Sequence, residues 1–238
     1  MRLTAGPVAL FLAVLAGWMA QADTISTVPE AVQRYARQLQ AVRKSAGPVS
    51  LEPLFEQGIA AGAAVQPQLE QFAAATYRQV QELMAGFFVG REEVVVAEPD
   101  AGFFLKLAEN GTATDRAFFG LLKKTYPESY WPAYKQQRTD YGGCIDFEGH
   151  FLTELYAEWM SFQKAYPGQY RRAAQKELTG IEEAVSGTCA CDGEEGVTRE
   201  LAAFQKAFPN APIAGQVAAV RAALASHTSP MRFHCQPQ

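Results

Sequence analysis

Hydrophobic residues recur at helical spacing along most of the chain. The first such stretch follows a capping box at residues 27–30 and places apolar side chains on one face at Val32, Tyr35, Leu39 and Val42. The same spacing predicts a helix that begins at Ser50 and a longer one over about 68–88. A further helix is expected between Asp100, as its N-cap, and Gly111. Residues 94–96 lean toward β structure, and either a short strand or extended chain fits them.

A six-residue phrase occurs three times in the second half of the chain. It reads Leu-Lys-Lys-Thr-Tyr-Pro at 122–127, Phe-Gln-Lys-Ala-Tyr-Pro at 162–167 and Phe-Gln-Lys-Ala-Phe-Pro at 204–209. Each copy predicts the end of an amphipathic helix, where an aromatic residue docks the last turn and proline stops the helix. The prolines lie 40 and 42 residues apart, and periods of this size are typical of stacked helical pairs.

The last of these units resembles a known type of helical hairpin. Residues 201–224 combine Ala-x-x-Phe, then Phe-Pro-Asn-Ala-Pro, then an alanine-rich segment, and look like a single hairpin of tetratricopeptide-type periplasmic proteins. The usual period of about 34 residues is missing, so the resemblance implies helical hairpins only. The expected fold is therefore all-α, with helical hairpins packed as a bundle or a short irregular solenoid.

The N-terminal residues read as an export signal. Arg2 supplies a positive start, residues 8–18 are uncharged and apolar, and Ala20-Gln21-Ala22 has the small-x-small pattern of a cleavage site. The apolar run is shorter than the roughly 20 residues that a spanning helix needs. We therefore expect a signal peptide at 1–22, a periplasmic or secreted location, and no membrane insertion after cleavage.

Export changes the interpretation of the cysteines. The sequence has four cysteines: Cys144, Cys189, Cys191 and Cys235. An even number of cysteines in an oxidising compartment favours disulfide bonds. A bond within Cys-x-Cys would close a strained ring, so two patterns stay open: 144–189 with 191–235, or 144–191 with 189–235. Two predicted helical hairpins, over about 145–185 and 196–226, return all four cysteines to one end. The rival interpretation, a redox or metal-binding Cys-x-Cys, has no histidine beside the pair.

Composition narrows the class of protein. Of 238 residues, 48% are hydrophobic, which excludes general disorder, and a formal net charge of −4 lacks the basic character of nucleic-acid binders. Behind the signal peptide we expect an N-terminal helical region over 23–112 and a C-terminal hairpin region over 113–238; one continuous domain of both regions is the alternative. The familiar nucleophile, zinc-protease, phosphate-loop and dinucleotide motifs are missing from the sequence.

The pattern of charged residues predicts no metal site and no cofactor. Asp146, His150, Glu154 and Glu158 follow one another at four-residue steps, opposite the apolar stripe of a predicted helix over 145–165. A metal site on His150, Glu154 and Glu158 is the alternative, but such a stripe is typical of a solvated helix face. Glu148 lies in line with the apolar stripe and is either a carboxyl with a raised pKa or a first-turn acid.

Aromatic side chains are concentrated in the segment over 118–141. Its candidate binding residues are Tyr126, Tyr130, Trp131 and Tyr134. Such side chains stack on sugars, although packing between helices is the simpler interpretation. Weak catalytic candidates, in and just after the segment, are Glu128, Asp140 and Glu148. Pro132 predicts the first turn of a helix, with Trp131 at its start.

Two functional hypotheses follow. The first, which we favour, is an exported protein that binds another envelope or extracellular protein as a scaffold, inhibitor or accessory factor; enzymatic activity is not favoured but stays open. The second is a cell-envelope glycan-binding protein or glycan hydrolase that uses the segment over 118–141. Two carboxyl groups about 5–10 Å apart in an open cleft would favour hydrolysis.

Overall fold

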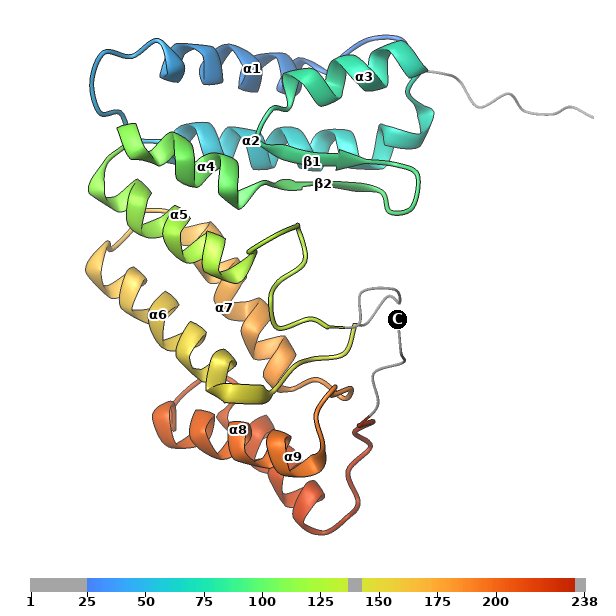
Figure 1. Ribbon diagram of the computed structural model, residues 1–238, viewed down its shortest axis with the longest axis vertical. Coiled ribbons are helices and arrows are strands. Elements are labelled where there is room, and N and C mark those ends of the chain that lie inside the picture. Colours follow the sequence, from blue (N-terminus) through green and yellow to red (C-terminus); the bar gives the residue numbers. More distant parts are fainter. Residues whose placement is uncertain (1–24, 137–142, 234–238) are drawn as a thin grey trace, which may run out of the picture.

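The protein is a stack of sequential helix pairs (Figure 1). The computed structural model describes residues 25–136 and 143–233. The paired helices are α1 (Glu30–Arg43) with α2 (Glu52–Val65), α4 (Ala101–Leu107) with α5 (Ala113–Thr125), α6 (Phe151–Ala165) with α7 (Arg171–Val185), and α8 (Glu194–Ala207) with α9 (Ala214–Ala225). Helix α3 (Ala74–Leu83) packs on α1, and the short 3₁₀ segments are η1 (Gln66–Gln71), η2 (Ala108–Asn110) and η3 (Glu148–His150). The predicted all-α class with packed hairpins is confirmed.

The recurring phrase ends three helices with one backbone geometry. At the residue after α5, α6 and α8 the helix stops at φ/ψ of −123/74°, −127/66° and −130/61°. In each case the N–H of this aromatic residue donates to the carbonyl four residues earlier, at 2.8, 2.9 and 2.8 Å. These aromatic residues are Tyr126, Tyr166 and Phe208. Because proline follows and cannot continue the helical ladder, the chain leaves the helix at the same point each time. The predicted helix ends are confirmed.

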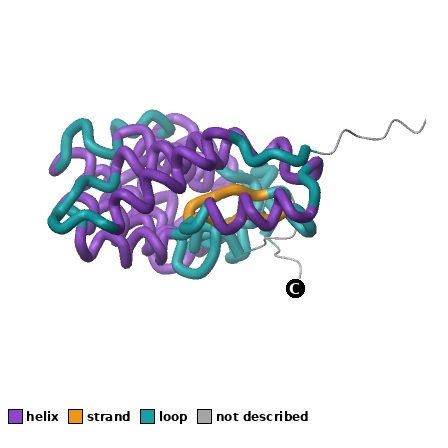
Figure 2. The backbone as a smooth tube through the Cα atoms, turned by 90° about the horizontal axis from the view of Figure 1, so that it is seen from above, coloured by secondary structure: helices purple, strands orange, loops and turns teal. Residues whose placement is uncertain are grey.

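The predicted helix over 68–88 is wrong in two places. Phe72 is extended, with φ/ψ of −68/134°, because the chain at Ile25 pairs with it through Ala73 N–H to Ile25 O at 3.0 Å. Gly86, at φ 97°, then turns the chain into β1 (Phe87–Gly90), which pairs antiparallel with β2 (Val96–Pro99). A Cβ at Gly86 would lie 2.5 Å from the Phe103 ring, so glycine is required there for space as well as conformation. Figure 2 shows this hairpin against the helices.

Two predicted helix starts near the cysteines are also wrong. Helix α6 begins at Phe151 rather than near Ile145, because Gly149 and His150 have positive φ values of 68° and 64°. The stripe from Asp146 to Glu158 is therefore not one helix face. Pro132 opens no helix: residues 126–136 form bends and a single turn, in which Lys135 N–H donates to Pro132 O at 2.9 Å.

The predicted disulfide in the C-terminal half is present between Cys144 and Cys189. This bond excludes the second of the two open patterns, and Cys191 is disulfide-bonded as well. Cys235, its predicted partner, lies outside the described residues. Among the helices of the described chain, none combines the length and apolar character needed to cross a membrane.

A single hydrophobic cluster runs through the stack from Val32 to Met231. Its centre is aromatic, and the Phe118 and Tyr170 rings stack there with centroids 3.9 Å apart. The fully buried Asp115 lies beside them and accepts a 2.6 Å hydrogen bond from the Tyr170 hydroxyl. This carboxylate links the start of α5 to the start of α7 across the core.

Candidate binding cleft

A cleft of about 850 Å³ lies between the segment 126–135 and helix α7. Figure 1 shows this segment leaving α5 and running beside α7. Cys144, Cys189 and Arg232 line the cleft as well, so the disulfide forms part of its wall. A second cavity of about 210 Å³ shares part of this lining, including Tyr126 and Tyr130.

Backbone hydrogen bonds hold the walls in place. Asp146 N–H donates to Tyr134 O and Ile145 N–H donates to Cys189 O, both at 2.9 Å. Arg232 N–H donates to Thr188 O, also at 2.9 Å. Four chain segments far apart in sequence therefore lie side by side at the disulfide end of the cleft. Each segment is paired with its neighbour, so these backbone groups are satisfied within the wall.

All four predicted binding residues line the cleft. Tyr130 and Trp131 are half-buried, with ring centroids 5.4 Å apart and planes inclined by 37°. The Phe88 ring, from β1, and the Tyr130 ring form a T-shaped pair with centroids 5.9 Å apart, and the Lys135 ammonium lies 5.7 Å from the centroid of Trp131. The two adjacent rings form a partly exposed aromatic surface, which we call the Tyr130–Trp131 platform.

Tyr134 and Tyr126 are held deeper in the same wall. Tyr134 is only 4% exposed, and its hydroxyl lies 3.2 Å from the position that a Cβ on Gly180 would take. The lack of a side chain at Gly180 thus lets Tyr134 approach α7 closely. Burial, together with the charges of Glu177 and Glu183, raises the pKa of Tyr134. Burial and Glu177 likewise raise the pKa of Tyr126, so both hydroxyls stay protonated as hydrogen-bond donors.

Glu177 is the buried acid of the cleft. It is 5% exposed, lines both cavities, and accepts a 3.0 Å hydrogen bond from the Tyr126 hydroxyl. Burial raises the pKa of Glu177 to about 7, and Glu98 adds to the rise, while Lys176 and the Tyr126 bond oppose it. The Lys176 ammonium instead pairs with Glu98 at 3.3 Å. Glu177 therefore titrates near neutral pH.

Glu177 was not among the residues predicted from the sequence, although its position on α7 carries a signal. Glu177 lies on the same face of α7 as the buried residues Ala174, Leu178 and Ile181. A carboxylate within an apolar stripe is costly to bury, and such residues are candidates for functional sites. This position on the hydrophobic face is what distinguishes it from the many other glutamates.

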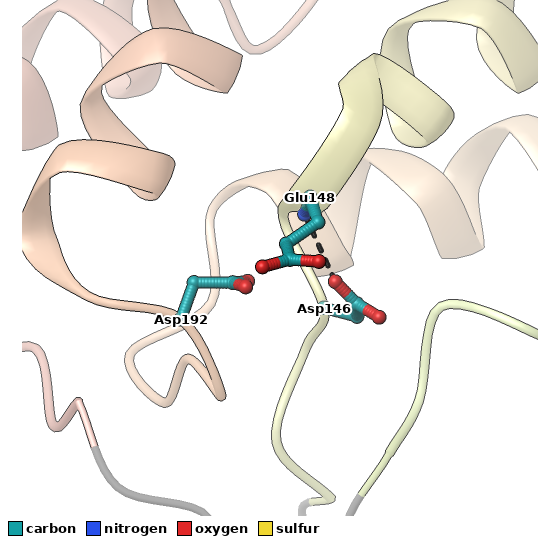
Figure 3. A group of neighbouring side chains, drawn as sticks. All are labelled: Asp146, Glu148 and Asp192. Atoms are coloured by element: carbon teal, nitrogen blue, oxygen red, sulfur yellow. Dashed lines mark hydrogen bonds between the residues drawn. The ribbon is translucent and has the colours of Figure 1, made fainter.

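The catalytic candidates from the sequence lie elsewhere. Glu128 is exposed and is not part of the cleft lining, and Asp140 lies outside the described residues. Glu148 is exposed and groups with Asp146 and Asp192, with one carboxylate oxygen of each within 4.8 Å of the others (Figure 3).

Local hydrogen bonds explain this acidic group. Asp146 accepts from Glu148 N–H at 2.9 Å, and Asp192 accepts from Phe147 N–H. Partial burial raises the pKa of Asp192. Two of the three carboxylates thus cap the turn that leads into α6, a structural role that needs no ion.

The buried Glu177 makes stability depend on pH. Its pKa in the folded state is about 7, above its ordinary value of 4.5, so the folded chain holds a proton that the unfolded chain has lost. Stability should fall as pH rises from about 4.5 to about 7, by at most about 3 kcal/mol from this group. Urea denaturation of wild type and Glu177→Gln at a series of pH values measures the difference, and the variant's profile should be flatter.

Glu182→Gln is the matched control for this experiment. Glu182 is on the same helix and accepts a 2.7 Å hydrogen bond from the Tyr156 hydroxyl, but it lies outside both cavities of the cleft. Its variant should keep the wild-type pH profile. Identical profiles for wild type and Glu177→Gln would show that Glu177 does not carry the effect.

Comparison with known proteins adds nothing to these observations. No protein-family model, curated protein or solved structure matches the chain.

Proposed function

We propose that the protein is exported and binds a glycan of the cell envelope in the cleft between residues 126–135 and α7. The observation that carries this proposal is the Tyr130–Trp131 platform: two half-buried rings meet inside a cleft of about 850 Å³. Sugar rings pack their C–H faces on such side chains, and polar groups around them select the orientation. Gln175 and Thr179, both exposed on α7, supply hydrogen-bonding groups along the facing wall. The Cys144–Cys189 bond suits an oxidising compartment.

The carboxyl groups of the cleft favour binding over hydrolysis. Glycosidases use two carboxyl groups that flank the scissile bond, one protonated and one ionised. In this cleft Glu98 is paired with Lys176 at 3.3 Å and Glu183 is exposed, so Glu177 is the buried carboxyl group of the three that line it. A binding protein requires no such pair.

Binding of a protein partner stays a prediction with less support. Among the described residues the exposed large hydrophobic side chains are Val94 and Met160, each 44% exposed, and they lie on different elements. Non-covalent protein interfaces usually centre on a contiguous apolar patch. A pull-down of the mature protein from envelope extract tests this hypothesis.

Truncation of the platform is the direct test of glycan binding. Trp131→Ala should weaken binding of N-acetylglucosamine oligosaccharides by at least about tenfold, because a stacked ring contributes on the order of 1 kcal/mol beyond its buried area. Trp131 is half-buried, so stability should fall by less than the roughly 3–5 kcal/mol expected for a core tryptophan. Isothermal titration calorimetry and thermal melting measure the two effects.

Tyr166→Ala is the control for this variant. Tyr166 is also half-buried and follows helix α6, but it does not line the cleft. It should leave glycan affinity unchanged. Unaltered affinity in Trp131→Ala, or no binding of any envelope glycan fragment by wild type, would contradict the proposed function.

A further inference from the structure

Glu177 has hydrogen-bonding capacity that its neighbours leave unused. Within the described chain it accepts one hydrogen bond, from Tyr126 to Oε2, and forms no ion pair. An ionised carboxylate offers about four acceptor positions on its two oxygens. Burial of such a group is costly unless a ligand or a protein group completes its contacts. A buried, under-used carboxylate that lines a cleft is therefore positioned for a ligand that donates hydrogen bonds.

The groups around Glu177 favour a cationic donor. From the facing segment, the Tyr126 and Tyr134 hydroxyls lie close enough for their titration to be coupled to Glu177. Glu98 from β2 adds negative charge, and the adjacent Lys176 is held by Glu98 at 3.3 Å. Tyr126 and Tyr130 line the second cavity together with Glu177, so aromatic rings border the carboxylate there. Aromatic rings beside a carboxylate are a typical environment for binding an ammonium group.

Two basic residues of the cleft lie beside the disulfide. Lys135 and Arg232 line the part that borders the disulfide, where Lys135 pairs in backbone register with Ile145, and Arg232 with Cys189. Neither residue lines the second cavity, where Glu177, Glu56 and Glu98 lie together with Arg172 and Lys176. The three acids of the second cavity thus outnumber its two basic residues, one of which, Lys176, is already paired with Glu98.

We propose that the cleft selects a glycan with a free amino group, whose ammonium binds the Glu177 carboxylate beside the rings of Tyr126 and Tyr130. This inference rests on the proposed glycan-binding function and names the chemical class of sugar. An ammonium group donates to the free oxygen of Glu177 and neutralises the buried charge, whereas an N-acetylated sugar offers one amide N–H and leaves the charge in place. The platform of Tyr130 and Trp131 then holds the neighbouring sugar ring.

The test compares two oligosaccharides that differ only at nitrogen. Isothermal titration calorimetry at pH 7 measures binding of the tetramers of glucosamine and of N-acetylglucosamine to the mature protein. Wild type should bind the glucosamine tetramer about tenfold or more tightly, the usual range for a charge-assisted hydrogen bond. Glu177→Gln should reduce this preference to less than about threefold while its affinity for the N-acetylated tetramer stays within the same factor. Glu182→Gln should behave as wild type.

Proton release gives a second measurement that needs only wild-type protein. At pH 6 the Glu177 carboxyl is mostly protonated, because burial raises its pKa to about 7. Pairing with an ammonium group ionises it, so binding of the glucosamine tetramer should release close to one proton. Titrations in buffers of different ionisation enthalpy count that proton, and the N-acetylated tetramer should release none.

The outcomes separate the two proposals. Equal affinity of wild type for both tetramers, or an unchanged preference in Glu177→Gln, overturns selection of an amino sugar and leaves glycan binding intact. If neither tetramer binds, glycan binding itself fails and the selection fails with it.

Discussion

Replacing both Cys144 and Cys189 with serine is expected to lower the free energy of unfolding by about 4 kcal/mol. The bond closes a loop with a sequence separation of 45 residues, and its loss returns that chain entropy to the unfolded state. Both cysteines are also buried, at 2% and 8% exposure, so the serine hydroxyls would lie among apolar neighbours. Urea denaturation under non-reducing conditions measures the change.

The same variant tests whether the disulfide shapes the cleft. Cys144 and Cys189 both line it, and backbone pairing of Ile145 with Ala190 continues beside the bond. Glycan affinity should therefore fall together with stability. Wild type treated with a reductant is the control and should lose at least as much stability. A loss below about 1 kcal/mol in the double variant would mean that the backbone ladder holds these segments without the disulfide.

The features that the sequence predicted correctly are local ones. The helix ends at Tyr126, Tyr166 and Phe208 were predicted from the six-residue phrase, in which an aromatic residue comes directly before proline. The hairpins α6–α7 and α8–α9 follow from those stops, because the next helix must return along the previous one. Pairing of Cys144 with Cys189 then becomes one of two patterns that the hairpins allow.

The features that the sequence did not predict depend on partners far away in the chain. Phe72 is extended because Ile25 pairs with it, and Ile145 leaves the helical pattern because its N–H donates to Cys189. Periodicity reports how a segment could bury its own apolar face, and it carries no information on such pairing. The helices predicted over 68–88 and from 145 were wrong for this reason.

Only the aromatic part of the candidate site could be predicted from the sequence, for a related reason. The aromatic residues cluster within nine positions of sequence, so composition alone selected Tyr126, Tyr130, Trp131 and Tyr134. Glu177 lies more than forty positions later and reaches Tyr126 only through the packing of α7 on the segment 126–135. The position of Glu177 on the apolar face of α7 can be recognised in the sequence. Its hydrogen bond with Tyr126 can be recognised only in the three-dimensional structure.

Asp115→Ala is expected to destabilise the protein by about 4 kcal/mol, because it leaves several buried donors without an acceptor. Oδ1 accepts from Leu51 N–H at 3.1 Å and from the Tyr170 hydroxyl at 2.6 Å, and Oδ2 accepts from Thr112 N–H at 2.7 Å. The carboxylate is fully buried, so water cannot replace these bonds without opening the core.

Asp100→Ala provides the matched control. Asp100 caps α4 by accepting from Gly102 N–H at 2.9 Å and Phe103 N–H at 3.1 Å, and it is half-buried. Loss of a helix cap alone costs about 1 kcal/mol. The difference between the two variants, measured by urea denaturation, is then the contribution of the cross-links to α2 and α7.

The position of Asp115 explains why this difference should be large. Helix α5 lies between the N-terminal pair α1–α2 and the pair α6–α7 in the stack (Figure 1), and the Asp115 carboxylate binds the segments that begin α2 and α7. Tyr170→Phe removes one of these links but keeps the ring stacked on Phe118 at 3.9 Å, so it should cost about 1–2 kcal/mol. If Asp115→Ala costs no more than Asp100→Ala, the carboxylate is only a helix cap, and the aromatic core alone joins the two halves of the stack.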